Sequence, residues 1–400
     1  MENTINKPQR NSCIEIMRII AMILIVFGHQ IDTYFYDGVG GTIDFQGVFP
    51  SSNPVFVLLS FVGPLGLLGD VLFIVCSAYF LLDSNRISVK KIFYLIATDT
   101  IIMSLVLIVR AGLGDTISTK QIFEAIFPTV LQVNWFIGYY IVFYLLHPFF
   151  NYVIRKLDKK GLAIVTLLLV IQCNIIAFGM GDAPGSLGLK LLCFISIYFV
   201  VAYYKLYGGK LWESKKFNVI VLIVSIFTYI AFRIAMNYIG LKVEYVAYRQ
   251  YGYAHINNPI IVVMAVAMLN LCARKVVHNK VVNYFAGLSL IFYLTHKNVL
   301  IFEYIPYIDY FVDTYGASNF VFAIFTKTLI VLGMGLILAI LYRHTIYYGV
   351  MWLSGKVEIG VMKIVNTVKD KYKAKKLQRE QQQNIDEQTE NESNSEDNEN

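Results

Sequence analysis

The chain of 400 residues is 57% hydrophobic and only 15% charged, with a formal net charge of +7. Soluble domains usually contain about 25% charged residues, so this composition excludes a soluble globular enzyme. The apolar residues gather into runs of about 20, the length that crosses a hydrocarbon core of about 30 Å. We therefore expect an all-α fold, a polytopic helical bundle in a membrane.

The apolar runs predict about ten transmembrane helices. They cover residues 14–35, 58–82, 92–110, 135–154, 161–179, 187–205, 217–239, 258–273, 284–303 and 319–343. The first run lacks a small-residue cleavage site, which favours a retained span over a removed signal peptide. An even number of spans places both termini on one side. The connections on that side contain sixteen Lys and Arg residues against five on the other, which predicts cytoplasmic termini.

The first span carries two ionisable side chains, Arg18 and His29, eleven residues apart. At about 100° per residue both lie on one helix face, about 16 Å apart along the axis. An imidazole inside a membrane can take a proton from an attacking hydroxyl and return it to a leaving group. The alternatives are an interhelical hydrogen bond for His29 and, more typical of Arg18 alone, a positive-inside anchor.

Two carboxylates belong to the same part of the chain. Asp32 lies three residues after His29 and is a candidate to fix the tautomer of its imidazole, or else a solvated residue at the helix end. Asp70 follows the glycine-rich "GPLGLLG" and is a candidate to face a cavity or to cap a re-entrant turn.

A compact basic cluster, Arg86, Lys90 and Lys91, follows the second span. Such a patch at the cytoplasmic surface can bind phosphate and pyrophosphate groups. It can equally serve as a topology signal with no ligand.

Aromatic residues are the next group of candidates. Trp135, Tyr79 and Tyr293 are candidates to line a ligand channel, although packing or interface anchoring is the commoner reason for each alone. His296 is a second intramembrane ionisable residue that can bind an acceptor or orient a partner side chain. His147, before Pro148, is more typical of a packing or kink feature.

The predicted extracytoplasmic loops, residues 30–53, 243–258 and 303–318, are rich in tyrosine and hydroxyl groups and poor in cations. Such surfaces suit neutral polyhydroxylated ligands, because rings stack on sugar faces. An aromatic belt at the headgroups is the commoner origin of this pattern.

The C-terminal region separates into two segments by charge. Residues 356–380 are lysine-rich with apolar residues on one face, which predicts a basic amphipathic helix on the anionic cytoplasmic leaflet. Residues 381–400 contain seven acidic residues and no basic one, which predicts a disordered tail.

The five cysteines are scattered, mostly inside apolar runs, and predict neither a disulfide nor a metal site. The sequence also lacks a phosphate-binding Gly-x-x-x-x-Gly-Lys-Ser/Thr loop, a His-Glu-x-x-His zinc motif and a Gly-x-Ser-x-Gly elbow. A covalent serine intermediate at Ser77 or Ser289 has no support in these patterns. Direct attack by a substrate hydroxyl, with His29 as the general base, is the favoured chemistry.

A basic residue, ten intervening residues and a histidine in the first span resemble the signature of acyltransferase family 3 membrane proteins. Four later segments resemble further family motifs in the expected order: "LGDVLFIVCSAYFLL" (68–82), "RISVKKIFYLI" (86–96), "NWFIGYYIVFYLLHPFFN" (134–151) and "LSLIFYLTHKNVL" (288–300). The first of these keeps Ser77, but Ala78 and Tyr79 replace the usual Gly and Phe. The resemblance covers about residues 10–345.

The resemblance implies an integral membrane O-acyltransferase that moves an acyl group, most often acetyl, from cytoplasmic acyl-CoA to a hydroxyl. The implied acceptor is a cell-surface polysaccharide or its lipid-linked precursor. Residues 1–355 would form the acyltransferase domain in the cell membrane, with membrane lipid, acyl-CoA and a glycan as partners. Acetyl-CoA would be a donor substrate, and neither a permanently bound cofactor nor nucleic acid is expected.

The residue patterns and the resemblance together give the expected site residues. The expected sites are catalytic His29 and Asp32, donor-binding Arg18, Arg86, Lys90 and Lys91, and substrate-binding Trp135, Tyr79, Tyr293 and His296.

Two other classes of function stay open at this point. A transporter of a glycan or glycolipid would also have many spans and intramembrane histidines, although the sequence has no convincing internal symmetry. A membrane sensor or scaffold would depend on the tail, so that removal of residues 356–400 would abolish its function, whereas the proposed enzyme should tolerate it.

Overall fold

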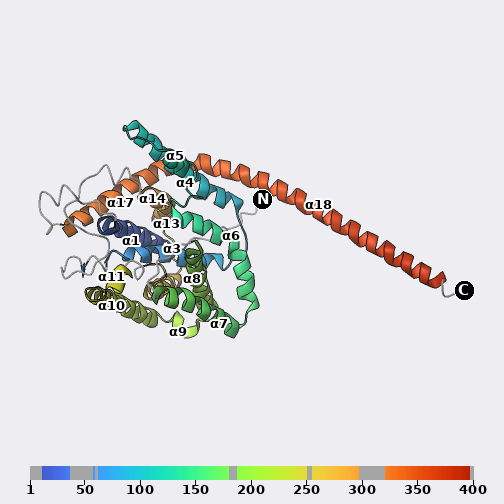
Figure 1. The fold of residues 1–400 in the computed structure, drawn as a ribbon, viewed down its shortest axis with the longest axis horizontal. Helices are drawn as coiled ribbons and strands as arrows, with labels where there is room; N and C mark the ends of the chain where they lie inside the picture. The colour runs from blue at the N-terminus through green and yellow to red at the C-terminus, as the bar shows by residue number, and fades with distance from the viewer. Residues whose placement is uncertain are drawn as a thin grey trace. The chain divides into compact units, whose positions relative to one another are not determined.

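The computed structural model describes residues 11–36, 57–58, 62–179, 187–249, 255–296 and 320–396. The regular elements in these ranges are all helices, which confirms the all-α class for the described part of the chain (Figure 1). The chain divides into two compact units. One contains residues 1–87 and 98–345, and the other contains residues 88–97 and 346–400.

The first unit contains most of the helices. They are α1 (Ser12–Tyr36), α3 (Leu65–Leu81), most of α4 (Val89–Gly112), α5 (Thr119–Ile126), α6 (Trp135–Lys156), α7 (Lys159–Val170), the π-helix η1 (Ile171–Ala177), α8 (Leu187–Tyr207), α9 (Gly209–Glu213), α10 (Lys215–Gly240), α11 (Glu244–Arg249), α12 (Pro259–Ala273), α13 (Lys280–Ala286), α14 (Ser289–His296) and α17 (Phe320–His344).

Seven helices of the described residues are long and apolar enough to cross a membrane. They comprise Ser12–Ile31, Val89–Gly112, Trp135–Lys156, Lys159–Ala177, Gly188–Tyr207, Lys215–Gly240 and Ile324–His344. Two further apolar helices are shorter, α3 with 17 residues and α12 with 15. The chain is therefore a multi-pass membrane protein by length and composition, and the expected count of about ten spans is not confirmed.

The differences from the expected spans have local causes. Pro64 precedes the first residue of α3, and Pro259 is the first residue of α12, so both helices begin where a proline is best tolerated. The run expected at 284–303 is not one helix, because Gly287 and Leu288 separate α13 from α14. Residues 297–303 of that run lie outside the described residues.

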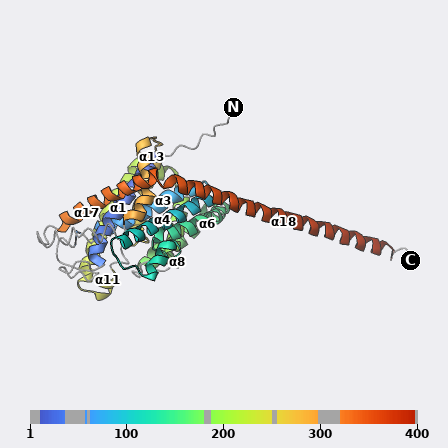
Figure 2. The same cartoon turned by 90° about the horizontal axis from the view of Figure 1, so that it is seen from above.

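The first helix is the centre of the first unit. It packs against α3, α12, α13, α14 and α17, and both views show α1 and α3 side by side (Figure 1, Figure 2). Gly28 of α1 faces Gly66 of α3 so closely that a Cβ atom on Gly28 would lie 2.7 Å from the Gly66 Cα atom. Gly69 is similarly close to the Ala21 carbonyl, 2.4 Å from its added Cβ. Small residues at a helix crossing let two membrane helices approach backbone to backbone.

A polar contact inside the apolar bundle fixes the π-helical turn. The Asn174 amide donates to the Asn257 carbonyl over 2.9 Å and accepts from the Ser196 hydroxyl over 2.8 Å. The thiols of Cys173 and Cys193 face each other with 3.0 Å between the sulfur atoms, and both cysteines are free. These contacts join η1 to α8.

The second unit combines the first turns of α4 with the long helix α18 (Tyr347–Glu396). The Glu358 carboxylate accepts from the Ser88 hydroxyl over 3.1 Å and from the Lys90 backbone N–H over 3.3 Å. α18 is one continuous helix that includes most of the acidic segment for which the composition predicts disorder. Its Glu, Gln and Lys residues have favourable helix propensity, a local preference that a count of charge does not capture.

Candidate functional site

The candidate site is built around His29, in the part of α1 that contacts α3. The adjacent Gly28 makes the close backbone contact with Gly66, so α1 has little freedom to shift at this level. His29 is half-buried, and the rise of a helix places it about 16 Å along α1 from Arg18. The expected separation between an interface cation and an imidazole at depth is therefore kept.

The structure brings a second histidine directly against His29. Nδ1 of His29 lies 2.8 Å from Nε2 of His296, which is the last residue of α14. The two rings stack with centroids 5.0 Å apart and planes inclined by 26°. The His296 side chain is 1% exposed. Two residues separated by 267 positions in the chain thus form one imidazole pair, with His296 buried and His29 half-buried.

The other nitrogen of His296 determines the proton arrangement of the pair. Nδ1 of His296 lies 2.6 Å from the carbonyl oxygen of Tyr293, and a carbonyl only accepts. Nδ1 of His296 therefore donates, and its Nε2 in the neutral ring is an acceptor for the N–H at Nδ1 of His29. This relay assigns the basic lone pair of His29 to Nε2, the nitrogen remote from His296.

A row of aromatic rings continues from the histidine pair. The Tyr293 ring lies 5.6 Å from the His296 ring and 5.9 Å from the Phe136 ring, and Phe136 lies 5.7 Å from Trp135. The Lys190 ammonium is 4.7 Å from the centre of the Trp135 ring. The structure thus connects three of the four expected substrate-binding residues, Trp135, Tyr293 and His296, through Phe136.

Tyr79, the fourth expected substrate-binding residue, lies elsewhere. It is thirteen residues beyond Gly66 on α3, which corresponds to about 20 Å along the helix. The Lys205 ammonium lies 4.2 Å from the centre of its ring. The structure therefore places Tyr79 toward the opposite end of α3 from the contact beside His29.

Arg18 has an acidic neighbour on its own helix. Its guanidinium Nη1 lies 3.4 Å from the Glu15 carboxylate, and the Glu15 side chain is 4% exposed. Nε of Arg18 is buried and has no hydrogen-bond partner within the described part of the chain. The role of Arg18 in donor binding stays a prediction.

The expected phosphate cluster is divided between the two units. Arg86 is exposed in the first unit, where its carbonyl accepts from the Tyr144 hydroxyl over 3.3 Å. Lys90 and Lys91 lie in the first turn of α4 in the second unit, where Glu358 occupies the Lys90 backbone N–H. The Glu358 carboxylate therefore already occupies one of the backbone N–H groups with which this helix start could bind an anion.

Asp32 follows His29 by about one turn of α1. Its side chain lies outside the described part of the structure, so its role beside the imidazole stays a prediction.

Asp99 is a buried carboxylate that the sequence reasoning missed. Its carboxylate is fully buried in α4 and accepts from Thr129 and Asn134, each over 2.7 Å. Asp99 and Asp70 both lie within electrostatic range of Tyr293, next to the histidine pair. A lone acidic residue in an otherwise apolar span was the available signal, because buried carboxylates in membranes are costly and usually functional.

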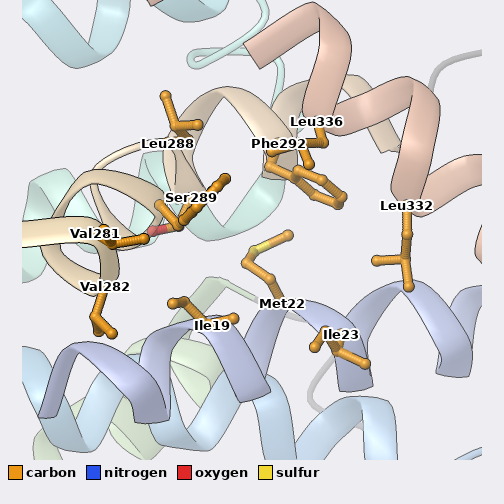
Figure 3. Close-up of a pocket in the computed structure, with 11 residues that line it drawn as sticks. Ile19, Met22, Ile23, Val281, Val282, Leu288, Ser289, Phe292, Leu332 and Leu336 are labelled. Atoms are coloured by element: carbon orange, nitrogen blue, oxygen red, sulfur yellow. The ribbon is translucent and has the colours of Figure 1, made fainter. Parts of the chain in front are cut away.

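An apolar cavity of about 340 Å³ lies between α1, α13, α14 and α17 (Figure 3). The side chains of Met22, Phe292 and Leu332 point toward it from three of these helices (Figure 3). The Ser289 hydroxyl on its wall donates to the Ala286 carbonyl, so its proton is already engaged. The cavity offers surface for an apolar chain, and the favoured chemistry does not use Ser289.

Comparison with known proteins gives one finding that spans the chain. A family model described as an acyltransferase domain matches residues 11–344. The match includes every helix from α1 to α17 and both histidines of the pair. Neither the curated proteins nor the solved structures give a match.

Proposed function

Because the chain belongs to acyltransferase family 3, we propose that it is a membrane O-acyltransferase with the His29–His296 pair at its centre. The acyl group, acetyl in the simplest case, comes from acyl-CoA on the cytoplasmic side. The acceptor is a hydroxyl of a cell-surface polysaccharide or of its lipid-linked precursor, and the protein works in the cell membrane.

The observation that carries the proposal is the hydrogen-bonded relay from Tyr293 to His29. A carbonyl fixes the proton on Nδ1 of His296, and His296 in turn holds the proton on Nδ1 of His29. A general base needs one unprotonated nitrogen in a constant orientation, and this arrangement supplies it at Nε2 of His29. His296 is then a positioning residue, with the role that a carboxylate has beside the histidine of a hydrolase triad.

Acyl transfer then proceeds by direct attack. Nε2 of His29 accepts the proton of the acceptor hydroxyl as the hydroxyl oxygen attacks the thioester carbonyl carbon. The carbon–sulfur bond breaks, the new carbon–oxygen ester bond remains, and the coenzyme A thiolate leaves. The His29 imidazolium returns its proton to that thiolate, so His29 ends the cycle neutral.

The surrounding residues fit the two substrates. The Trp135–Phe136–Tyr293 row offers ring faces beside the base for a sugar. Arg18, one helix segment toward the predicted cytoplasmic side, offers a guanidinium for a donor phosphate. The apolar cavity next to Met22 and Phe292 would suit a longer acyl chain or a lipid tail of the acceptor.

The proposal is tested by the consumption of acetyl-CoA in nanodiscs that contain the full-length protein and the lipid-linked glycan of its host. Wild type should release free coenzyme A and label the glycan with radioactive acetyl groups. The His29→Ala variant should do neither, although it is inserted in equal amounts. Full glycan labelling by the variant would contradict the role of His29. In sealed proteoliposomes, glycan movement across the bilayer by the wild type without thioester cleavage would support a transporter instead.

A further inference from the structure

A second cavity, of about 590 Å³, lies where α3, α8 and α12 end and α9 begins. Tyr79, Tyr204 and Trp212 give it three aromatic walls, and Lys205 and Arg274 give it two cations. Its volume is within the range of about 300 to 1,000 Å³ that is typical of small-molecule sites. The distribution of Lys and Arg predicts that these helix ends face the cytoplasm.

Two buried asparagines hold the Trp212 segment in place. The Asn218 amide donates to the Trp212 carbonyl over 2.6 Å, and the Asn270 amide donates to the same carbonyl over 2.7 Å. Asn270 also donates to the Asn218 side-chain oxygen over 2.7 Å. Amides within apolar helices are costly unless they are hydrogen-bonded. Their convergence on a single connecting segment indicates a cavity wall that is built in advance of any ligand.

The chain turns sharply to bring Trp212 back onto α8. Gly209 has a φ of +63°, and a Cβ atom on Gly208 would lie 2.6 Å from the Tyr204 carbonyl oxygen. Residues without a side chain are therefore required at this turn. As a result the Trp212 ring lies 5.7 Å from the Tyr204 ring, and both line the cavity.

The cations of the cavity are also positioned. The Lys205 ammonium donates to the Tyr79 carbonyl over 2.8 Å and to the Asp83 carboxylate over 2.6 Å. An ammonium group has three donors, so these two bonds orient the third. Arg274 is exposed and lies within electrostatic range of Tyr204. The lining also contains the acidic Glu213, and since Lys205 is ion-paired with Asp83, Arg274 is the lining cation for which no ion pair is found among the described residues.

The cavity lies close to the Arg18 region of α1. The buried Cys76, one turn before Tyr79 on α3, is within electrostatic range of both Arg18 and Cys272. Cys272 is two residues before Arg274, at the end of α12. Arg18 therefore lies toward the same end of the α1–α3 pair as the cavity.

We infer that this cavity binds the adenosine phosphate head of the coenzyme A donor. Trp212 and Tyr204 would stack on the purine, because aromatic rings bind any base by its face. Arg274 and Lys205 would bind the phosphates. The inference rests on the proposed function, and it moves the donor head away from Lys90 and Lys91, where Glu358 already occupies the helix start.

The test measures the binding of coenzyme A and of adenosine 3′,5′-bisphosphate to the full-length protein in nanodiscs of neutral lipid. Arg274→Gln should weaken the binding of both ligands by about 10- to 100-fold, the effect of one lost charge-assisted contact. The matched control, Lys275→Gln, removes the adjacent exposed cation outside the cavity and should change neither. Trp212→Leu should weaken both by about 10-fold, whereas Trp352→Leu in α18 should not.

Three results would overturn the inference. The first is equal binding of the bisphosphate to wild type and Arg274→Gln. The second is binding of coenzyme A with the affinity of pantetheine alone. The third is a combination of two observations in nanodiscs with phosphatidylglycerol: the wild type does not bind the bisphosphate, and Arg274→Gln loses an anionic lipid that the wild type binds. That combination would identify a lipid headgroup site.

Acyl transfer is measured in parallel so that the two proposals fail separately. If the wild type transfers acetyl groups and Arg274→Gln keeps the same KM for acetyl-CoA, the cavity assignment is wrong and the enzyme assignment stands. If the wild type binds the bisphosphate at this cavity but cleaves no thioester, the enzyme assignment fails, and the site is one for a phosphorylated purine nucleotide.

Discussion

His147 and His296 begin from the same local sequence and end in different environments. Each is the last residue of a Tyr-Leu-x-His segment within a helix, 144–147 in α6 and 293–296 in α14. In each case Nδ1 faces the carbonyl of the tyrosine three residues earlier. Nε2 of His296 meets His29, whereas Nε2 of His147 is buried without a hydrogen-bond partner in the described structure.

The difference shows what a local motif can and cannot specify. The i−3 carbonyl fixes the same tautomer in both rings, because that geometry depends only on the helix. The His147 ring stacks on Tyr144 with centroids 5.1 Å apart, and its Nε2 has no hydrogen-bond partner in the described residues. His296 contacts a second imidazole, that of His29, and can therefore fix the orientation of a general base.

The largest expected effect is the loss of the base itself. His29→Ala should lower the rate of acyl transfer by about 10²- to 10⁴-fold, the usual contribution of a general base. His147→Ala is the matched histidine truncation and should lower the rate per inserted protein far less, because Nε2 of His147 has no hydrogen-bond partner in the described residues and so orients no base. Equal losses in the two variants, measured by release of coenzyme A, would remove the distinction between the histidines.

The second effect sharpens the role of His296 as a positioning residue. His296→Leu removes the acceptor for the His29 N–H and should lower kcat by roughly 10- to 100-fold with an unchanged KM for acetyl-CoA. His296→Gln can keep an acceptor near the Nε2 position and should recover most of that loss. A purely structural role would predict similar losses for both variants, together with less inserted protein.

The third effect concerns the helix contact beside His29. Gly28→Ala would place a Cβ atom 2.7 Å from the Gly66 Cα atom and 2.8 Å from the Gly63 carbonyl oxygen, so α1 and α3 must separate. We expect the free energy of unfolding to fall by about 1 to 3 kcal/mol. Gly333→Ala in α17, where the added atom meets nothing within 4 Å, is the control. When thermal unfolding is measured in detergent, the Tm should fall for Gly28→Ala and stay unchanged for Gly333→Ala.

The smallest effect is expected at His147 when its shape is kept. His147→Leu removes a buried nitrogen that has no hydrogen-bond partner in the described structure and fills the space with an apolar group. The same change removes the Nδ1–H that donates to the Tyr144 carbonyl, which receives no helical N–H because the residue four positions later is Pro148, so the free energy of unfolding should fall by about 1 kcal/mol. A large loss of Tm or of transfer would show that His147 has a partner in the working protein and would bring it closer to His296 in role.

Several site features could be read from the sequence because they depend on short spacing. The relation of Arg18 to His29 follows from the pitch of one helix, and a histidine in an apolar run is unusual by itself. Asp99 carried the same kind of signal, a lone charge in a span, and could have been found in this way. The helix count was less predictable, because Pro64, Pro259 and the break at Gly287 shorten or divide runs that composition alone joins.

The separate placement of Tyr79 and Tyr293 shows where sequence reasoning stops. Both were expected to line one channel, since both are tyrosines in or near apolar spans. The structure puts Tyr293 beside His296 and Tyr79 beside Lys205. Which aromatic side chain meets which cation depends on how helices distant in the chain are arranged, and no periodicity within one helix contains that information.

The sequence by itself determined the membrane class and the family signature, because these depend on composition and on the spacing of residues within single segments. Only the tertiary structure decided that His29 and His296 form a pair. That contact needs α1 and α14 to pack through Met22, Val26 and Phe292, and close packing of side chains from distant segments is a property of the whole core.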